Sequence, residues 1–163
     1  MLTEAQLKAA AKEHFAAEEA RDVEWIGRTV AENVEYIVLE PGYSDDPLRA
    51  PGAAEGNTTG RQAVKDLWTN YYEIFHNHRI LCRDEDMYVI PDRNLVFCNV
   101  RITATPTQDF EGFPANKEFS YTVGALCAYN DEGKMTRETV YGSMGRVLMG
   151  LRRMREWASE SAH

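Results

Sequence analysis

Two tyrosines, Tyr121 and Tyr141, lie in strand-like segments where their phenol groups could do chemistry. Side chains alternate along a strand, so residues two apart share a face. By this alternation Tyr121 shares a face with Val123 and Ala125, and Tyr141 shares one with Thr139; we expect both faces to point inward. A phenol that faces a cavity can donate a hydrogen bond to a ligand carbonyl. The alternative is that each ring only packs in the core.

Two histidines, His76 and His78, are separated by one residue and would share one face of a strand. Two imidazoles on one face can indicate a metal site, but no third ligand has suitable spacing. The segment also begins at the end of a helix. We therefore expect a solvated turn here and no metal site.

The three cysteines, Cys82, Cys98 and Cys127, are odd in number and lack a Cys-x-x-Cys spacing. This pattern favours reduced, mostly buried thiols in a cytoplasmic protein. Cys98 and Cys127 lack a recognisable basic partner, so we interpret them as small core residues and not as nucleophiles. The sequence contains no glycine-rich phosphate loop, nucleotide fingerprint or Ser-His-Asp arrangement, and we expect no cofactor.

The amino-terminal elements that would hold these residues are helical. Thr3 and Gln6 form a capping box that predicts a helix to about Ala20, and Asp22 caps a short second helix. A strand is expected from Val34 to Leu39. The face of the first helix that we expect to be buried carries five residues: Leu7, Ala11, His14, Phe15 and Glu18.

A long irregular stretch, 42–58, rich in proline and glycine, separates that strand from the third helix, and stretches of this kind are often lids. The third helix starts near Arg61 and has the clearest periodicity in the chain. Its apolar stripe, which we interpret mostly as core, comprises Val64, Leu67, Trp68, Tyr71, Tyr72 and Phe75.

Four extended segments follow, and a closing helix after Ser143 ends the chain. The segments run over 78–90, 95–106, 116–129 and 134–141. On the second of them the apolar set, and so the expected inner face, is Val96, Cys98, Val100 and Ile102. This order of elements predicts a single α+β domain over residues 1–163, with one curved antiparallel sheet and helices on one face.

Composition limits the partners. The 163 residues carry 18 Lys+Arg against 26 Asp+Glu, a formal charge of -8, which disfavours nucleic acid and anionic membranes. No segment reaches membrane-spanning length.

The last third of the chain resembles a SnoaL-like domain of the NTF2-like superfamily. In that family a strand ending Glu-x-x-Tyr-x-Asp leads into a helix with Leu-Leu-x-Gln-Leu-Gly; residues 138–143 and 147–151 have the same frame. Residues 59–64 resemble the Gly-Arg-x-Ala that opens the family's third helix, and 110–117 resemble its Phe-x-Gly-x-Pro-Pro-Thr-Gly-Lys loop. The resemblance implies a cone-like fold with a deep apolar pocket, and a homodimer through the outer face of the sheet.

The residues that do acid–base work in SnoaL-like cyclases are not present here. The family's strand His falls on Pro106 and its Asp falls on Ser143, and neither side chain can accept a proton near neutral pH. The resemblance therefore does not support the cyclase mechanism on these residues.

Ketosteroid isomerase, of the same superfamily, offers a second comparison. Its base is a carboxylate before a proline at the end of the first strand, which resembles Glu40-Pro41. Its tyrosine donor falls on His14, and its acidic donor falls on Ala125, where that group is missing. A buried glutamate has a raised pKa and can move a proton. The alternatives are a solvated strand end for Glu40 and a locally bonded helix histidine for His14.

Together these patterns predict that the protein binds a small apolar molecule, such as a polyketide, steroid or terpenoid, and isomerises, cyclises or dehydrates it without a cofactor. Glu40 would be the base, with His14, Tyr121 and Tyr141 as donors to an oxyanion. The expected ligand contacts are Trp68, Tyr72, Cys98, Val100, Ser143 and Met144. The alternative is a non-catalytic binding or dimeric assembly domain.

Overall fold

The structure is a computed structural model that describes residues 1–39, 58–110 and 113–142. The expectations for Glu40, Ser143 and Met144, for the stretch 42–58 and for the closing helix lie outside the described residues.

Three helices precede most of the sheet. Helix α1 spans Glu4–Glu19, α2 spans Val23–Thr29 and α3 spans Arg61–Ile74. The predicted caps are confirmed: Thr3 and Gln6 bond reciprocally at the start of α1, and Asp22 accepts from the Trp25 amide at 2.8 Å. Each cap satisfies amides that a helix start leaves without partners.

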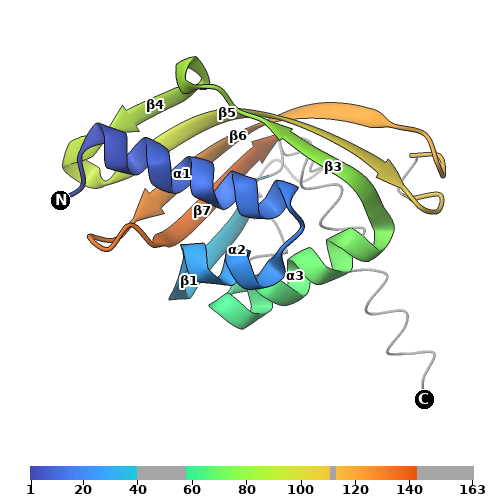
Figure 1. The fold of residues 1–163 in the computed structure, drawn as a ribbon, viewed down its shortest axis with the longest axis horizontal. Helices are drawn as coiled ribbons and strands as arrows, with labels where there is room; N and C mark the ends of the chain where they lie inside the picture. Colours follow the sequence, from blue (N-terminus) through green and yellow to red (C-terminus); the bar gives the residue numbers. More distant parts are fainter. Residues whose placement is uncertain (40–57, 111–112, 143–163) are drawn as a thin grey trace, which may run out of the picture.

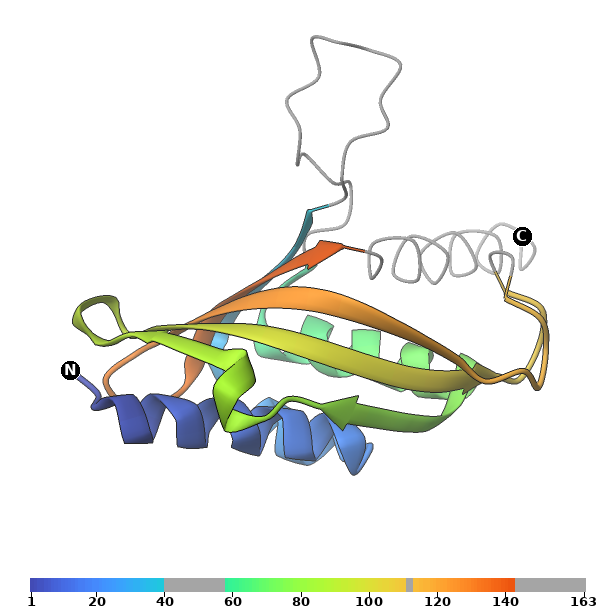
Figure 2. The same cartoon turned by 90° about the horizontal axis from the view of Figure 1, so that it is seen from above.

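Seven strands form one curved, mixed sheet in the order β2-β1-β7-β6-β5-β3, with β4 beside β5. Among the strands of the described residues, only β1 and β7 pair in parallel. Figures 1 and 2 show α1 and α2 on one side of this sheet. The strands are β1 Val30–Leu39, β2 Thr58–Thr59, β3 Phe75–Leu81, β4 Met87–Ile90, β5 Leu95–Pro106, β6 Phe119–Tyr129 and β7 Met135–Gly142. Short 3-10 turns at Asp84–Asp86 and Pro91–Arg93 flank β4.

The predicted α+β class is confirmed, with two differences in detail. The segment expected as one strand over 78–90 is two strands, because the turn at Asp84–Asp86 interrupts it. The sheet is mixed and not purely antiparallel, because β1 lies beside β7 in the same direction. None of the described helices is long and apolar enough to cross a membrane.

The inner face of the sheet carries the core. On β5 the predicted inward set is confirmed, with each member at most 5% exposed: Val96, Cys98, Val100 and Ile102. On β6 the alternation is also as expected, since Val123, Ala125, Cys127 and Tyr129 are buried. The opposite face of β5 is exposed at Phe97, Asn99 and Arg101.

The side chains of β7 alternate in the opposite phase to the one expected from the sequence. Val140 pairs with Ala125 and Glu138 pairs with Cys127, so the inward set on β7 has even numbers. A bulge in β7 is the cause: Met135 pairs with Tyr129, but the next pair is Arg137 with Ala128, so β7 has one extra residue there. Met135 therefore points inward before the bulge, and even-numbered residues point inward after it. The expected inward position of Tyr141 was therefore wrong, and its ring is 42% exposed.

Substitution on β7 tests this orientation. We expect Val140→Ala to lower the free energy of unfolding by about 2 kcal/mol, because it removes two buried methyl groups from the inner face of the sheet. We expect Tyr141→Ala to lower it by less than about 1 kcal/mol, because that ring lies at the surface. Urea unfolding of both variants measures the difference, and the reverse order of stabilities would contradict the pairing described.

Candidate active site

A cavity lies between α1, α3 and the inner face of the sheet. Its wall is largely aromatic and aliphatic but includes two carboxyl groups. Its total space, with its open mouth, is about 520 Å³, of which about 30 Å³ is open to the centres of water molecules. A water needs about 10–15 Å³ of such space, so the narrow part takes two or three waters or a compact group of similar size. The lining residues are Phe15, Glu18, Tyr36, Leu67, Trp68, Tyr71, Val100, Ile102, Val123, Ala125, Glu138 and Val140.

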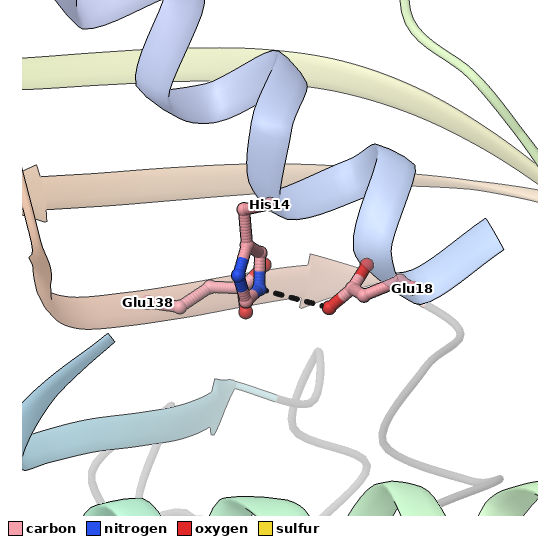
Figure 3. Close-up of side chains that lie close together, drawn as sticks. All are labelled: His14, Glu18 and Glu138. Atoms are coloured by element: carbon pink, nitrogen blue, oxygen red, sulfur yellow. Dashed lines mark ion pairs between the residues drawn. The ribbon is translucent and has the colours of Figure 1, made fainter. Parts of the chain in front are cut away.

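Three buried ionisable side chains lie close together (Figure 3), and two of them, Glu18 and Glu138, line this cavity. His14 and Glu18 project from successive turns of α1, and Glu138 reaches them from β7. His14 Nε2 lies 3.0 Å from Glu18 Oε1. One ligand atom from each of the three residues lies within 4.8 Å of the other two. We call His14, Glu18 and Glu138 the acid–base cluster.

The neighbours of His14 fix its orientation and its tautomer. Nδ1 lies 2.6 Å from the Thr29 hydroxyl, which donates its own hydrogen to the Ile26 carbonyl at 2.7 Å. Nδ1 must therefore carry the hydrogen of that bond. Nε2 lies 2.7 Å from the Tyr36 hydroxyl. The ring is thus held from two sides, and Nε2 is the nitrogen that gains or loses a proton.

Tyr36 connects the imidazole to the second carboxyl group. The parallel pairing of β1 and β7 sets Tyr36 directly beside Glu138, and the two side chains are hydrogen-bonded. His14, Tyr36 and Glu138 therefore form a continuous chain of polar groups. Glu18 Oε1, in contrast, makes no well-aligned hydrogen bond with any described residue, although it is buried.

Burial and neighbouring charges raise the pKa values of two members of the acid–base cluster, Glu138 and His14. Burial raises the pKa of Glu138, the charge of Glu18 raises it further, and His14 and Tyr36 offset part of the rise, leaving it at about 7. Burial alone would lower the pKa of His14, but the neighbouring carboxylates, Glu18 first, outweigh this and raise it. A carboxyl group with a pKa near 7 can both give and take a proton at physiological pH.

The acid–base cluster also has donor types that hold divalent metals, one imidazole and two carboxylates. In the geometry described, however, each short contact suits a proton: Nε2 points at a hydroxyl 2.7 Å away and lies 3.0 Å from a carboxylate. We therefore describe the cluster as a proton-holding site.

The predicted site residues divide into those at the cavity and those away from it. His14 is fully buried and is joined to the cavity through Tyr36 and Glu18, and Trp68 and Val100 line the wall. Cys98 is buried but is not among the described lining residues. Tyr72 stacks on Trp68 and donates to the Glu18 carbonyl at 2.7 Å, so it supports the wall from behind.

Tyr121 belongs to a second polar group beside the cavity. It is hydrogen-bonded to Tyr71, whose hydroxyl lies 3.1 Å from His78 Nδ1. His78 is 3% exposed, so the expected solvated turn was wrong for this residue. Strand β3 already begins at Phe75, and a left-handed residue, Asn77 with φ 53°, turns His78 inward. Burial and the charge of Arg21 lower the pKa of His78 to about 4, so it is neutral at pH 7.

Sequence reasoning missed Glu138, Glu18 and Tyr36 as functional residues. The signal for Glu18 was present, because a spacing of four places it on the buried face of α1 with His14. Glu138 was hidden by the bulge in β7, which reverses the alternation. Tyr36 on β1 could be recognised only from its pairing with Glu138 on β7, a strand that is distant in sequence.

Comparison with solved structures identifies the fold. A candidate polyketide cyclase from Xanthomonas campestris pv. campestris matches with a TM-score of 0.65 at 18% identity, over 90% of this chain and 96% of the other. PrhC from Penicillium brasilianum matches with a TM-score of 0.67 at 15% identity, over 95% and 93%. The chain has the NTF2-like fold.

A third structure carries a small ligand. A protein from Catenulispora acidiphila with a ketosteroid isomerase-like fold, solved in complex with trimethylamine, matches with a TM-score of 0.62 at 16% identity, over 86% of this chain and 90% of the other. No protein-family model matches the sequence, and no curated protein matches it. The similarity to the solved structures shows the NTF2-like fold predicted from the sequence, at identities too low to transfer an activity.

The raised pKa of Glu138 makes a prediction about stability. The pKa of Glu138 is about 7 in the folded chain and 4.5 in the unfolded chain. Its proton therefore stabilises the folded state fully below about pH 4.5, and this stabilisation is lost as the pH rises through about 7. His14, whose pKa is also raised, acts in the same direction. We expect Glu138→Gln to remove about 3 kcal/mol of this pH dependence, since one pKa unit corresponds to about 1.4 kcal/mol.

Urea unfolding of the native chain and Glu138→Gln between about pH 5 and pH 8 measures this effect. Glu132→Gln, at an exposed turn position, is the matched control and should follow the native curve. Parallel curves for the native chain and Glu138→Gln would show that Glu138 titrates in its ordinary range.

Proposed function

We propose that this NTF2-like protein binds a small, largely apolar molecule in the cavity and moves a proton on it without a cofactor. The observation that carries this proposal is a carboxyl group with a pKa near 7, Glu138, in the wall of an otherwise apolar cavity. Groups whose pKa is shifted by burial and a specific charged neighbour are typical of acid–base sites.

In the proposed mechanism Glu138 is the group that exchanges a proton with the ligand. As a carboxylate it takes a proton from a carbon next to a carbonyl group, and as an acid it returns the proton to another position. Tyr36 also lines the cavity, so its hydroxyl can turn from Glu138 to the developing oxyanion once Glu138 is protonated. His14 supports that hydroxyl from the other side, and Glu18 stabilises the imidazolium.

This mechanism fits an isomerisation, cyclisation or dehydration that passes through an enolate. It assigns the role of base to Glu138, which the sequence comparison had assigned to Glu40. The cavity formed by the described residues limits the reacting part of the ligand to a compact group, because only about 30 Å³ is open to water centres. A polyketide, steroid or terpenoid would place one end of its skeleton there.

Proton exchange can be measured directly. We expect the native protein in deuterated water to introduce deuterium next to the carbonyl of small branched or cyclic ketones, as followed by proton NMR. We expect Glu138→Gln to slow this exchange by about 10²- to 10⁴-fold, the usual contribution of a general acid–base group. Tyr36→Phe should slow it less, because the carboxyl group remains.

Two controls separate chemistry from folding. Glu132→Gln should exchange at the native rate, and a melting curve should show that Glu138→Gln is folded under the assay conditions. If ketones raise the melting temperature of native protein and Glu138→Gln equally but exchange in neither, the protein is a non-catalytic binding domain.

The homodimer stays a prediction, and the outer face of the sheet supports it. That face exposes Tyr88 and Phe97, which pair across the neighbouring strands β4 and β5, and Tyr141 on β7. We expect Phe97→Asp to halve the mass measured by light scattering, because a charge there would be desolvated in an interface. An unchanged mass would place any dimer contact elsewhere.

A cytoplasmic location also stays a prediction, supported by three unpaired cysteines.

A further inference from the structure

The charged groups on the cavity wall are all acidic among the described lining residues. Two carboxyl groups, Glu18 and Glu138, line the cavity, and neither a lysine nor an arginine is among the described lining residues. The nearby Arg21 is directed elsewhere: its guanidinium lies over the ring of Tyr72, 5.1 Å from the centroid, and donates to the Tyr72 carbonyl. The only basic group in the acid–base cluster is therefore His14.

The charges of the acid–base cluster do not balance when all its members are ionised. One imidazolium and two carboxylates leave one net negative charge in a buried site. An uncompensated buried charge is costly, and one added proton or one bound cation neutralises it equally well. Glu18 Oε1 is buried in a residue that lines the cavity; His14 Nε2 lies 3.0 Å away, but the atom makes no well-aligned hydrogen bond with any described residue and so can accept one from a ligand.

We propose that the ligand which enters this cavity is a small organic cation, a compound carrying a protonated or quaternary amine, and that its positive charge replaces the proton held by the acid–base cluster. The inference rests on the same site as the proposed function and specifies the chemical class of the ligand.

The rest of the wall suits such a cation. Four aromatic rings line the cavity: Phe15, Tyr36, Trp68 and Tyr71. Trp68 and Tyr71 meet edge to face at 5.2 Å, and Tyr72 supports Trp68 from behind. Aromatic rings attract cations, and rings grouped around a cavity are the usual way in which proteins recognise quaternary ammonium groups.

Cation binding is then linked to proton release from Glu138. The groups that face Glu138 come from every element packed against it: His14 and Glu18 from α1, Tyr36 from β1, and Cys127, Tyr129 and Cys98 from the neighbouring strands. The thiols and phenols keep their protons near neutral pH: a hydrogen bond with Cys127, and then burial, raises the pKa of Cys98, and burial raises the pKa values of Tyr36, Cys127 and Tyr129. The groups whose shifted pKa values set the local charge are Glu138 and His14. A cation therefore binds better above the pKa of Glu138 and turns that residue into the carboxylate needed as a base.

The test compares two molecules of one shape. Choline and 3,3-dimethylbutan-1-ol have the same shape, but choline has a positively charged quaternary nitrogen where the second compound has a neutral carbon. We expect isothermal titration calorimetry on chelator-treated protein at about pH 8 to show choline binding about tenfold tighter or more, as cation–π and charge attraction predict. We expect choline affinity to fall about tenfold by pH 6, where Glu138 is protonated, and the alcohol to bind equally at both values.

Variants and buffers locate the effect. Glu138→Gln and Glu18→Gln should each weaken choline by about tenfold and leave the alcohol unchanged, while Glu132→Gln should alter neither. Titrations at about pH 7, where about half of Glu138 still carries its proton, in two buffers of different ionisation enthalpy should show protons released with choline only. The pH comparison uses native protein, so it stands even if a variant does not fold.

Three results would overturn the inference: the alcohol binding as tightly as choline, neither molecule binding, or choline affinity that does not change with pH. These results are separate from the deuterium exchange of neutral ketones. Exchange without choline binding would overturn the cationic ligand and leave the proton chemistry intact. Choline binding without any exchange would support the cationic ligand and overturn the proposed proton transfer.

Discussion

The burial of two carboxyl groups around one imidazole is the constraint on which the rest of this structure depends. Each carboxyl group alone would be costly in an apolar interior, and the imidazole alone would lose its charge. Placed together, they hold a proton at a pKa near neutrality. The local cost in stability is what sequences accept at functional sites, and it is consistent with the proposed acid–base role.

The elements around the acid–base cluster are arranged to meet that constraint. Helix α1 supplies two members from successive turns, α2 ends at the hydroxyl that orients the imidazole, and the parallel pair β1 and β7 supplies a phenol beside a carboxyl group. The one parallel pair in the part of the sheet that the structure describes thus lies where Tyr36 and Glu138 stand next to one another. The antiparallel strands beside it provide the apolar wall.

Most of the fold could be predicted from local signals, and the site could be predicted only in part. The caps at Thr3 and Asp22 and the alternation on β5 are encoded by residues close in sequence, so they could be recognised without the structure. His14 was selected from the resemblance to ketosteroid isomerase. Glu138 was missed because a single inserted residue reverses the faces of β7, and neither composition nor spacing marks that bulge.

The tie between α3 and α1 has a consequence for how such a cavity can change in evolution. Tyr72 on α3 holds the Glu18 carbonyl at 2.7 Å, and Arg21, just beyond α1, holds the Tyr72 carbonyl at 2.6 Å. Moving α3 outward to admit a larger ligand would drag Glu18 and disturb the acid–base cluster. Shortening the side chains of Val100 or Ile102 on β5 would enlarge the cavity and leave the cluster in place. New ligand sizes are therefore more accessible through the sheet than through the helices.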